Sequence, residues 1–403
     1  MNVRRCQLFT TLWIVSYSKV LSRFACHLQV RLCARFAALH SQHQQFAAGR
    51  QHGSYVATSY GLRSTSEFLE GSFKGVRGTV AHIDMQKGYT WRPQQVPDEQ
   101  AFPAMKAAVE SGATIWSSSS IYGMPPNPPT AGLLLLRRYF EKYPEDAFKV
   151  TLFIRACYDP STFSPTTTRD GVRASWDECN QILGGVKKID VFGPARMDQN
   201  IPVEETIHAL KELVEEGKIG AIGLSEVRAE TIKRASAVAP IKFTEVEFSL
   251  WSTEIIDNGV AAAAKEHNVI LLSYAPLGYG FLSGTVKKVE DIPQGDTRHM
   301  FGRFQPENFN KNLELAEKIE AFAKSKNLTS AQLALAWIRA HSNTGVFGTI
   351  IPIPGATGVP RVRENSQAVE ISAEDKEALD KIVQSFNVAG HRQIPGLESN
   401  IWT

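Results

Sequence analysis

The sequence predicts an α/β protein, a single (β/α)8 TIM barrel that follows a separate leader. Three observations predict this fold. From residue 78 onward, eight short runs rich in β-branched residues are each followed by a stretch with helical periodicity, as in parallel α/β folds. A doubly wound sheet would need a G-x-G-x-x-G turn after its first strand, and residues 79–95 contain none. The 403 residues provide enough chain for a barrel of about 250–300 residues and a leader.

The first half of the series extends from residue 79 to residue 216. Its strands are expected at residues 79–83, 114–116, 150–154 and 189–192, and its helices at 98–111, 133–143, 176–183 and 202–216. In the first of these helices Pro103 is tolerable only within the first turn, because proline has no N–H to donate. Glu204 and Glu205 place negative charge in the first turn of the fourth helix, as the helix dipole favours.

The second half follows the same rule as far as residue 385. Its strands are expected at 219–224, 243–248, 269–273 and 349–353, the first of them punctuated by Gly220 and Gly223, and its helices at 230–238, 253–266, 330–341 and 373–385. An additional helix at 311–325 precedes the helix at 330–341, for which Thr329 and Ser330 form a natural N-cap.

The beginning of the chain differs from the rest in charge. Residues 1–66 contain no Asp or Glu but many arginines and serines, a composition typical of a mitochondrial presequence. The alternative is a leader with no targeting role. We therefore expect residues 1–75 to be a disordered or targeting leader and residues 76–403 to form the barrel. The expected location is cytoplasmic, or mitochondrial if the leader is a presequence.

Composition excludes several classes of function. A net charge of +3 is too small to indicate a nucleic-acid partner, and no segment reaches the roughly 18 apolar residues that a membrane span needs. The five cysteines have no C-x-x-C spacing, which argues against a disulfide framework or a metal site. The expected partner is a small molecule, and the sequence leaves the oligomeric state open.

In a barrel, catalytic residues lie on the loops at the carboxyl ends of the strands. The predicted strands place a set of polar and aromatic residues at that end, together with the segment after Ile353: Trp91, Tyr122, Arg155, Arg196, Ser225, Glu245 and Tyr274. This grouping follows from the alternation of strands and helices alone.

Four segments, in order along the chain, resemble motifs of the aldo-keto reductases. Residues 112–123 resemble G-x-x-x-[FW]-D-T-A-x-x-Y-G, residues 216–225 resemble EGKIR-x-IGLS, residues 274–278 match Y-[SA]-PLG, and residues 354–365 match the R-x-x-E-N cofactor signature. Further segments at 88–93, 139–146, 189–198 and 247–252 are similar to the fungal pyridoxal-reductase branch of this family. The resemblance extends from about residue 88 to residue 388.

The resemblance implies the reduction of an aldehyde by hydride from NADPH, with pyridoxal converted to pyridoxine and Tyr122 as the proton donor. A tyrosine hydroxyl has an ordinary pKa of about 10, and a cation about 4–5 Å away would favour its deprotonated form by about 3–4 kcal/mol. At the positions of the family's aspartate and lysine, this chain has Ser117 and Arg155. Arg155 keeps the positive charge but cannot titrate.

These departures leave an alternative open. Besides Ser117 and Arg155, the segment 85–91 departs from the glycine-rich turn of the branch, GLMGLTW, and has only one of its two glycines, Gly88. The alternative to an active reductase is a catalytically impaired NADPH-binding barrel with a regulatory or interaction role.

The cofactor residues implied by the resemblance form a longer set. The resemblance places Ser225 and Glu245 near the nicotinamide, Tyr274 against its ring, Leu277 and Gly278 along the pyrophosphate, Arg361 on the 2′-phosphate, and Glu364 and Asn365 on the adenine. An arginine on that phosphate favours NADPH over NADH. Trp91 and Trp251 are expected to form aromatic walls around the substrate, with Arg196 beside them.

Overall fold

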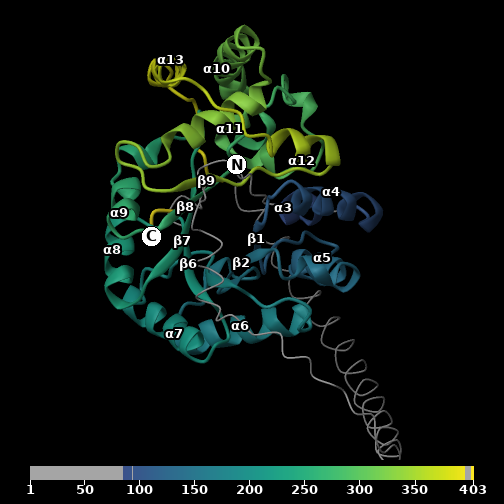
Figure 1. Ribbon diagram of the computed structural model, residues 1–403, viewed down its shortest axis with the longest axis vertical. Helices are drawn as coiled ribbons and strands as arrows, with labels where there is room; N and C mark the ends of the chain where they lie inside the picture. Colours follow the sequence, from purple (N-terminus) through teal and green to yellow (C-terminus); the bar gives the residue numbers. More distant parts are fainter. Residues whose placement is uncertain (1–84, 93, 395–400) are drawn as a thin grey trace, which may run out of the picture. The chain divides into compact units, whose positions relative to one another are not determined.

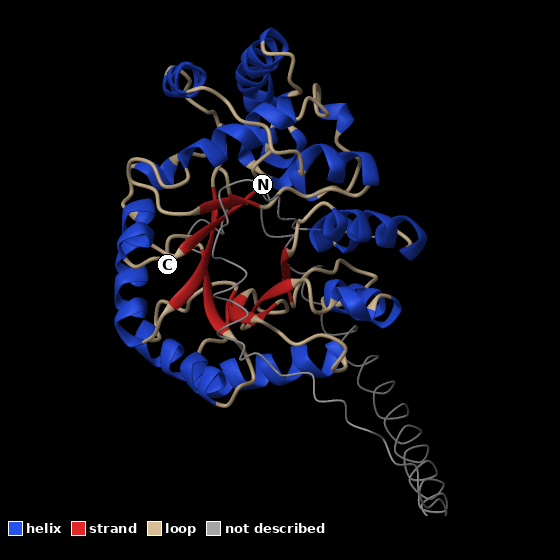
Figure 2. Ribbon diagram, in the orientation of Figure 1, coloured by secondary structure: helices blue, strands red, loops and turns tan. Residues whose placement is uncertain are grey.

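The structure is a computed structural model of the chain, and it describes residues 85–92, 94–394 and 401–403. Within these residues seven parallel strands form one curled sheet, with helices on its outer face (Figure 2). The strands are β1 (Ile115–Ser119), β2 (Thr151–Ala156), β5 (Val191–Pro194), β6 (Ala221–Ser225), β7 (Ile241–Glu247), β8 (Ile270–Tyr274) and β9 (Ile350–Pro352).

Neighbouring strands follow one another in the sequence, in the order β1-β2-β5-β6-β7-β8-β9. This order, with a helix between consecutive parallel strands, is that of a (β/α)8 barrel and confirms the predicted fold class. The strand expected at 79–83 lies outside the described residues. A short antiparallel pair, β3 (Tyr158–Asp159) and β4 (Ser164–Pro165), extends from the carboxyl end of β2.

The helices of the outer layer surround the sheet (Figure 1). They are α4 (Asp98–Glu110), α5 (Ala131–Lys142), α6 (Arg169–Leu183), α7 (Val203–Glu215), α8 (Ala229–Val238), α9 (Val260–Glu266), α11 (Ser330–His341) and α13 (Ala373–Gln384), with α3 (Met85–Thr90), α10 (Pro306–Ser325) and α12 (Val359–Asn365) in addition. Thr329 caps α11 as expected, because its hydroxyl accepts the Gln332 N–H. Among the described residues, no helix is long and apolar enough to cross a membrane.

Two helices differ from the sequence prediction. Pro103 is the sixth residue of α4, beyond the first turn, so the expectation for it was wrong. The helix tolerates the lost hydrogen bond because Phe102 and Met105 bury its inner face. The helix expected at 253–266 is broken into a 3-10 turn at Glu254–Ile256 and α9, because Gly259 between them has a φ of 85°.

Side chains inside the sheet change from apolar to polar along the strands. Successive residues of a strand point to opposite faces, so every second residue points inward. One inward set forms a compact apolar layer of Ile115, Phe153, Val191, Phe243, Leu272, Ile351 and Ile353. Two residues further toward the carboxyl ends, the inward positions hold Ser117, Arg155, Glu245 and Tyr274. The polar layer therefore lies above an apolar floor, at the end of the barrel where active sites form.

A glycine makes room for one of the two phenylalanines of that floor. A Cβ built on Gly223 would lie 2.5 Å from the ring of Phe153, so only glycine fits opposite it. Phe153 in turn precedes Arg155 by two residues on β2, and its packing fixes the strand that carries the guanidinium.

Candidate active site

Tyr122 follows β1 and is held at both ends. Its backbone carbonyl accepts hydrogen bonds from the Thr90 hydroxyl at 2.6 Å and from the Gly132 N–H at 3.0 Å. Its hydroxyl accepts a hydrogen bond from Nη2 of Arg155, and the Arg155 guanidinium carbon lies 5.3 Å from the centre of the Tyr122 ring. With 4% exposure, the tyrosine presents a fixed hydroxyl rather than a mobile one.

The anion that Ser117 does not provide comes from Glu245, on β7. Oε1 of Glu245 lies 2.9 Å from Nη1 of Arg155, and its Oε2 accepts a hydrogen bond of 2.5 Å from the Ser117 hydroxyl. The Arg155 and Glu245 side chains are 8% and 1% exposed. A buried ion pair is stable only where such additional hydrogen bonds complete its geometry. The place of Glu245 near the nicotinamide stays a prediction, and in the structure its carboxylate also anchors Arg155.

The chemistry of this cluster differs from that of a titrating lysine. A guanidinium keeps its proton at any physiological pH, so Arg155 supplies charge and orientation but releases no proton. A positive charge at this distance would stabilise a tyrosinate at Tyr122. Glu245 and Ser117 hold the guanidinium beside the Tyr122 hydroxyl.

Of two further predicted residues, Trp91 contacts this cluster, and Arg196 follows β5, the strand beside β2. The Trp91 ring lies 5.5 Å from the Tyr122 ring, centre to centre and tilted by 37°, and Trp91 is half-buried. Arg196 is half-buried at the end of β5 and donates to the carbonyl of Ala195 at 2.5 Å and to the Ser225 hydroxyl at 3.4 Å. Arg196 thus ties the loop after β5 to the end of β6.

Trp251 lies in a separate aromatic cluster. It is 3% exposed, stacks on Phe281 at 4.5 Å and meets Phe304 edge-on at 5.3 Å. A Cβ on Gly278 would lie 2.8 Å from the Trp251 ring, so this tryptophan supports the turn that carries Gly278. Its expected contact with substrate stays a prediction.

The residues expected to hold the nicotinamide end of a cofactor lie on adjacent strands. Ser225 ends β6 and is buried, and Tyr274 ends β8 and is half-buried. Leu277 is half-buried, and Gly278 follows it with a φ of 55° in a 3-10 turn. These positions are at the same end of the sheet as Tyr122.

The residues expected at the adenosine end lie on and beside α12. Arg361 is exposed, which leaves its guanidinium accessible to a phosphate. Glu364 accepts a hydrogen bond of 2.7 Å from the Thr329 hydroxyl, and Asn365 is 3% exposed. One short helix thus holds an accessible cation that can pair with a phosphate, together with a carboxylate that can accept and an amide that can both donate and accept hydrogen bonds.

Sequence reasoning missed a buried charged cluster beside Tyr274. Arg392 pairs with Glu226 at 2.7 Å and with Glu247 at 3.0 Å, and it donates to the Tyr274 hydroxyl at 3.2 Å. Burial raises the pKa of a carboxyl, but Arg392 outweighs it and holds the pKa of Glu226 below its ordinary value. Burial, reinforced by the two carboxylates, raises the pKa of Tyr274 well above its usual range. One signal was available: Glu247 follows Glu245 by two residues, so both point inward.

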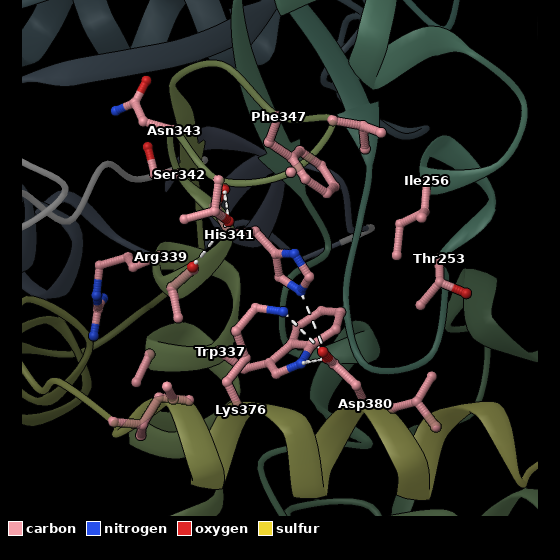
Figure 3. A pocket seen from close by; sticks show the side chains of 18 of the residues that line it. Thr253, Ile256, Trp337, Arg339, His341, Ser342, Asn343, Phe347, Lys376 and Asp380 are labelled. Atoms are coloured by element: carbon pink, nitrogen blue, oxygen red, sulfur yellow. Dashed lines mark hydrogen bonds and ion pairs between the residues drawn. The ribbon is translucent and has the colours of Figure 1, made fainter.

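A surface cavity of about 1050 Å³ lies away from Tyr122, between α11, α13 and the 3-10 turn after β7 (Figure 3). Asp380 accepts hydrogen bonds there from Trp337 at 2.7 Å and from Lys376 at 2.8 Å, and it lies 3.8 Å from Nε2 of His341. Burial and the nearby Lys376 lower the pKa of His341 to about 4, so its ring is neutral at physiological pH. These contacts join α11 to α13.

Comparison with known proteins gives a consistent result. The chain matches the model described as Aldo/keto reductase family over residues 85–384. It is 38% identical over 320 residues to a Schizosaccharomyces pombe protein named "Probable pyridoxal reductase 2", covering 78% of this chain and 94% of that protein. It is 37% identical over 302 residues to an aldo-keto reductase of the same organism whose name specifies NADP(+), covering 73% and 86%. The glycerol dehydrogenase of Gluconobacter oxydans has the same fold, with a TM-score of 0.64 at 21% identity over 76% of this chain and 92% of that chain.

The fold and the site define a class first. A curled parallel sheet with a buried polar cluster at its carboxyl ends is the arrangement of a (β/α)8-barrel enzyme. The chain belongs to the aldo/keto reductase family, as the match over residues 85–384 and the relatives at 37–38% identity show.

Proposed function

We propose that this protein is an NADPH-dependent aldehyde reductase that converts pyridoxal to pyridoxine, with Tyr122 as the proton donor. The observation that carries the proposal is the buried chain of contacts from Tyr122 through Arg155 to Glu245 and Ser117. The similarity to a protein named as a pyridoxal reductase supports the choice of substrate.

When bound, NADPH supplies the hydride, which adds to the aldehyde carbon and leaves negative charge on its oxygen. The Tyr122 hydroxyl donates its proton to that oxygen, which completes the alcohol. Arg155 stabilises the tyrosinate that remains, and Glu245 with Ser117 keeps the guanidinium directed at it. Because Arg155 cannot give up a proton, solvent at the mouth of the barrel must return the proton to Tyr122.

We assign the cofactor to residues at both ends of the site. Ser225 offers a hydroxyl to the nicotinamide amide, and the Tyr274 ring offers a face to the nicotinamide. The backbone of Leu277 and Gly278 lines the pyrophosphate, and Arg361 pairs with the 2′-phosphate, with Glu364 and Asn365 at the adenine. The exposure of Arg361 beside the more buried Glu364 and Asn365 supports this assignment.

The test is an assay of the purified full chain with NADPH and pyridoxal. The oxidation of NADPH is monitored as the loss of absorbance in the nicotinamide band. The unmodified protein should turn over, and Tyr122→Phe should bind NADPH normally but reduce pyridoxal at least a hundredfold more slowly, since general acid catalysis contributes about 10²–10⁴. Full activity in Tyr122→Phe would refute the assigned proton donor.

One observation favours a second function. Arg155 cannot act as a relay, and an NADPH-binding barrel with a regulatory role would need none. The discriminating variant restores the family arrangement with Ser117→Asp, Arg155→Lys and Glu245→Gln together, because Ser117→Asp alone would place a second carboxylate against that of Glu245. A protein that binds NADPH, reduces no aldehyde of a panel and stays inert after this restoration would have the regulatory function.

A further inference from the structure

The two described parts of the chain after α13, residues 385–394 and 401–403, both contact the barrel. Asn312 of α10 holds the first part through two hydrogen bonds of 2.8 Å to the backbone of Ala389. Farther along, the Thr403 N–H donates to the Glu226 carbonyl at 3.2 Å, and the Thr231 hydroxyl donates to the Thr403 carbonyl at 2.8 Å. The chain after α13 is thus fastened on both sides of Arg392.

Arg392 is 4% exposed and contacts three adjacent strands at once. Glu226 comes directly after β6, Glu247 is the last residue of β7, and Tyr274 is the last residue of β8. The guanidinium reaches all three side chains, at 2.7, 3.0 and 3.2 Å. On its other side it packs over the Trp402 ring at 4.8 Å.

The charges around Tyr274 depend on this guanidinium. Glu226 and Glu247 are both buried, and a second cation, Arg303, lies 3.9 Å from Glu247. Without Arg392, two carboxylates would share one cation beside the Tyr274 hydroxyl, and a buried anion without its partner is strongly unfavourable. Arg392 therefore determines both the charge and the hydrogen bond at the outer edge of the Tyr274 ring.

We propose that Arg392 is a positioning residue that orients the Tyr274 ring for the nicotinamide. The strand fixes the backbone end of the ring, since Tyr274 pairs with Glu247 in the β7–β8 register, and Arg392 fixes its hydroxyl end. This inference rests on the proposed function, in which Tyr274 stacks on the nicotinamide. Because a misplacement of about 1 Å can cost a hundredfold in rate, Arg392 should affect hydride transfer more than substrate binding.

The test is a double-mutant cycle in the full chain with Arg392→Gln and Tyr274→Phe, the second of which removes the hydroxyl and keeps the ring. Each variant should lower kcat about fivefold to twentyfold with little change in the KM for pyridoxal, and the double variant should be no slower than the slower single variant. With NADPH deuterated at the transferred position, the isotope effect on kcat should rise in both. Arg392→Lys should restore part of the rate.

The matched control is Lys187→Gln, which removes another buried cation from its carboxylate, Asp190, at 2.6 Å. It should lower the melting temperature and leave kcat unchanged. If Arg392→Gln does not fold, Tyr274→Phe and Arg392→Lys still test the contact. The proposal would be overturned if the fold-losses of kcat in the two single variants multiplied in the double variant. It would also be overturned if Arg392→Gln and Tyr274→Phe lost no more kcat than Lys187→Gln.

A binding measurement separates this inference from the proposed function. The circular dichroism of bound NADPH in its nicotinamide band should change in Arg392→Gln and Tyr274→Phe but not in Lys187→Gln. An unchanged spectrum on a protein that binds NADPH would refute the role of Arg392 alone. A protein that binds no NADPH would refute both proposals.

Discussion

Arg155 offers the sharpest test of the electrostatics, provided that its partner is changed with it. Arg155→Gln alone would leave Glu245 buried without its cation, which costs about 3–5 kcal/mol of stability. Arg155→Gln with Glu245→Gln removes both charges and keeps the polar contacts possible. The expected outcome is a folded protein with a weaker proton donor.

The magnitude follows from the contacts. A full positive charge about 4 Å from the tyrosinate oxygen stabilises it by about 4 kcal/mol at an effective dielectric constant of 20. The Glu245 carboxylate lies beyond the guanidinium and offsets roughly half of this by the same relation, which leaves about 2 kcal/mol. If between half and all of the negative charge has developed in the transition state, kcat should fall about fivefold to thirtyfold.

The assay is kcat for pyridoxal at saturating NADPH, with the dissociation constant of NADPH measured in parallel. The double variant should bind NADPH nearly as the unmodified chain does, because the residues assigned to the adenosine end, Arg361, Glu364 and Asn365, are unchanged. Glu245→Gln alone is the informative control: it keeps the cation and removes the opposing carboxylate, so charge alone should raise kcat, and any loss of rate reports orientation. A double variant with unchanged kcat would refute the view that Arg155 stabilises the tyrosinate.

Three further outcomes are expected. Arg361→Ala should raise the dissociation constant of NADPH about tenfold to a hundredfold, since a charge-assisted contact contributes roughly 1.5–3 kcal/mol. The dissociation constant of NADH should stay unchanged. Equal affinities of the unmodified protein for NADPH and NADH would contradict the assignment. His341 has a pKa of about 4 in the folded protein, against an ordinary value of 6.5. As the pH falls, the unfolded chain therefore binds a proton at this histidine before the folded protein does. The free energy of unfolding should drop by up to about 3 kcal/mol between pH 6.5 and 4. Denaturant titrations at several pH values should show that the free energy of unfolding falls less with pH in His341→Phe. An unchanged dependence on pH in this variant would refute the role of His341. Removal of residues 1–75 should leave the melting temperature close to that of the full chain, and loss of cooperative unfolding would show that the leader is part of the core.

The sequence was sufficient for the fold because the barrel repeats one local rule. Each strand expected between residues 114 and 353 lies within a few residues of an observed strand. The departures occur where a single residue overrides the pattern, as Gly259 does when its positive φ breaks the helix expected at 253–266. The sequence also predicted that Tyr122 and Arg155 lie side by side. They follow or end two neighbouring parallel strands, β1 and β2, and such strands end at the same edge of the sheet.

The contacts across the barrel were not predictable in the same way. Glu245 reaches Arg155 only because the sheet curls, which brings β7 opposite β2 although three strand pairings separate them. Arg392 comes from the segment after the last helix, where no periodicity indicates a destination. The local pattern of strands and helices predicts which residues lie at the mouth of a barrel. Which of these residues contact one another across the barrel depends on the curvature of the sheet.

The link between Ser117 and Glu245 joins positions 128 residues apart, and this separation has a kinetic consequence. Contacts between distant parts of a chain form late in folding, because the intervening loop must be closed before they are gained. The cation beside Tyr122 is therefore anchored only after most of the sheet has assembled. During refolding, the return of reductase activity should lag behind the return of helical circular dichroism, and a fragment that ends before β7 should have the tyrosine and the arginine without the anion that holds them.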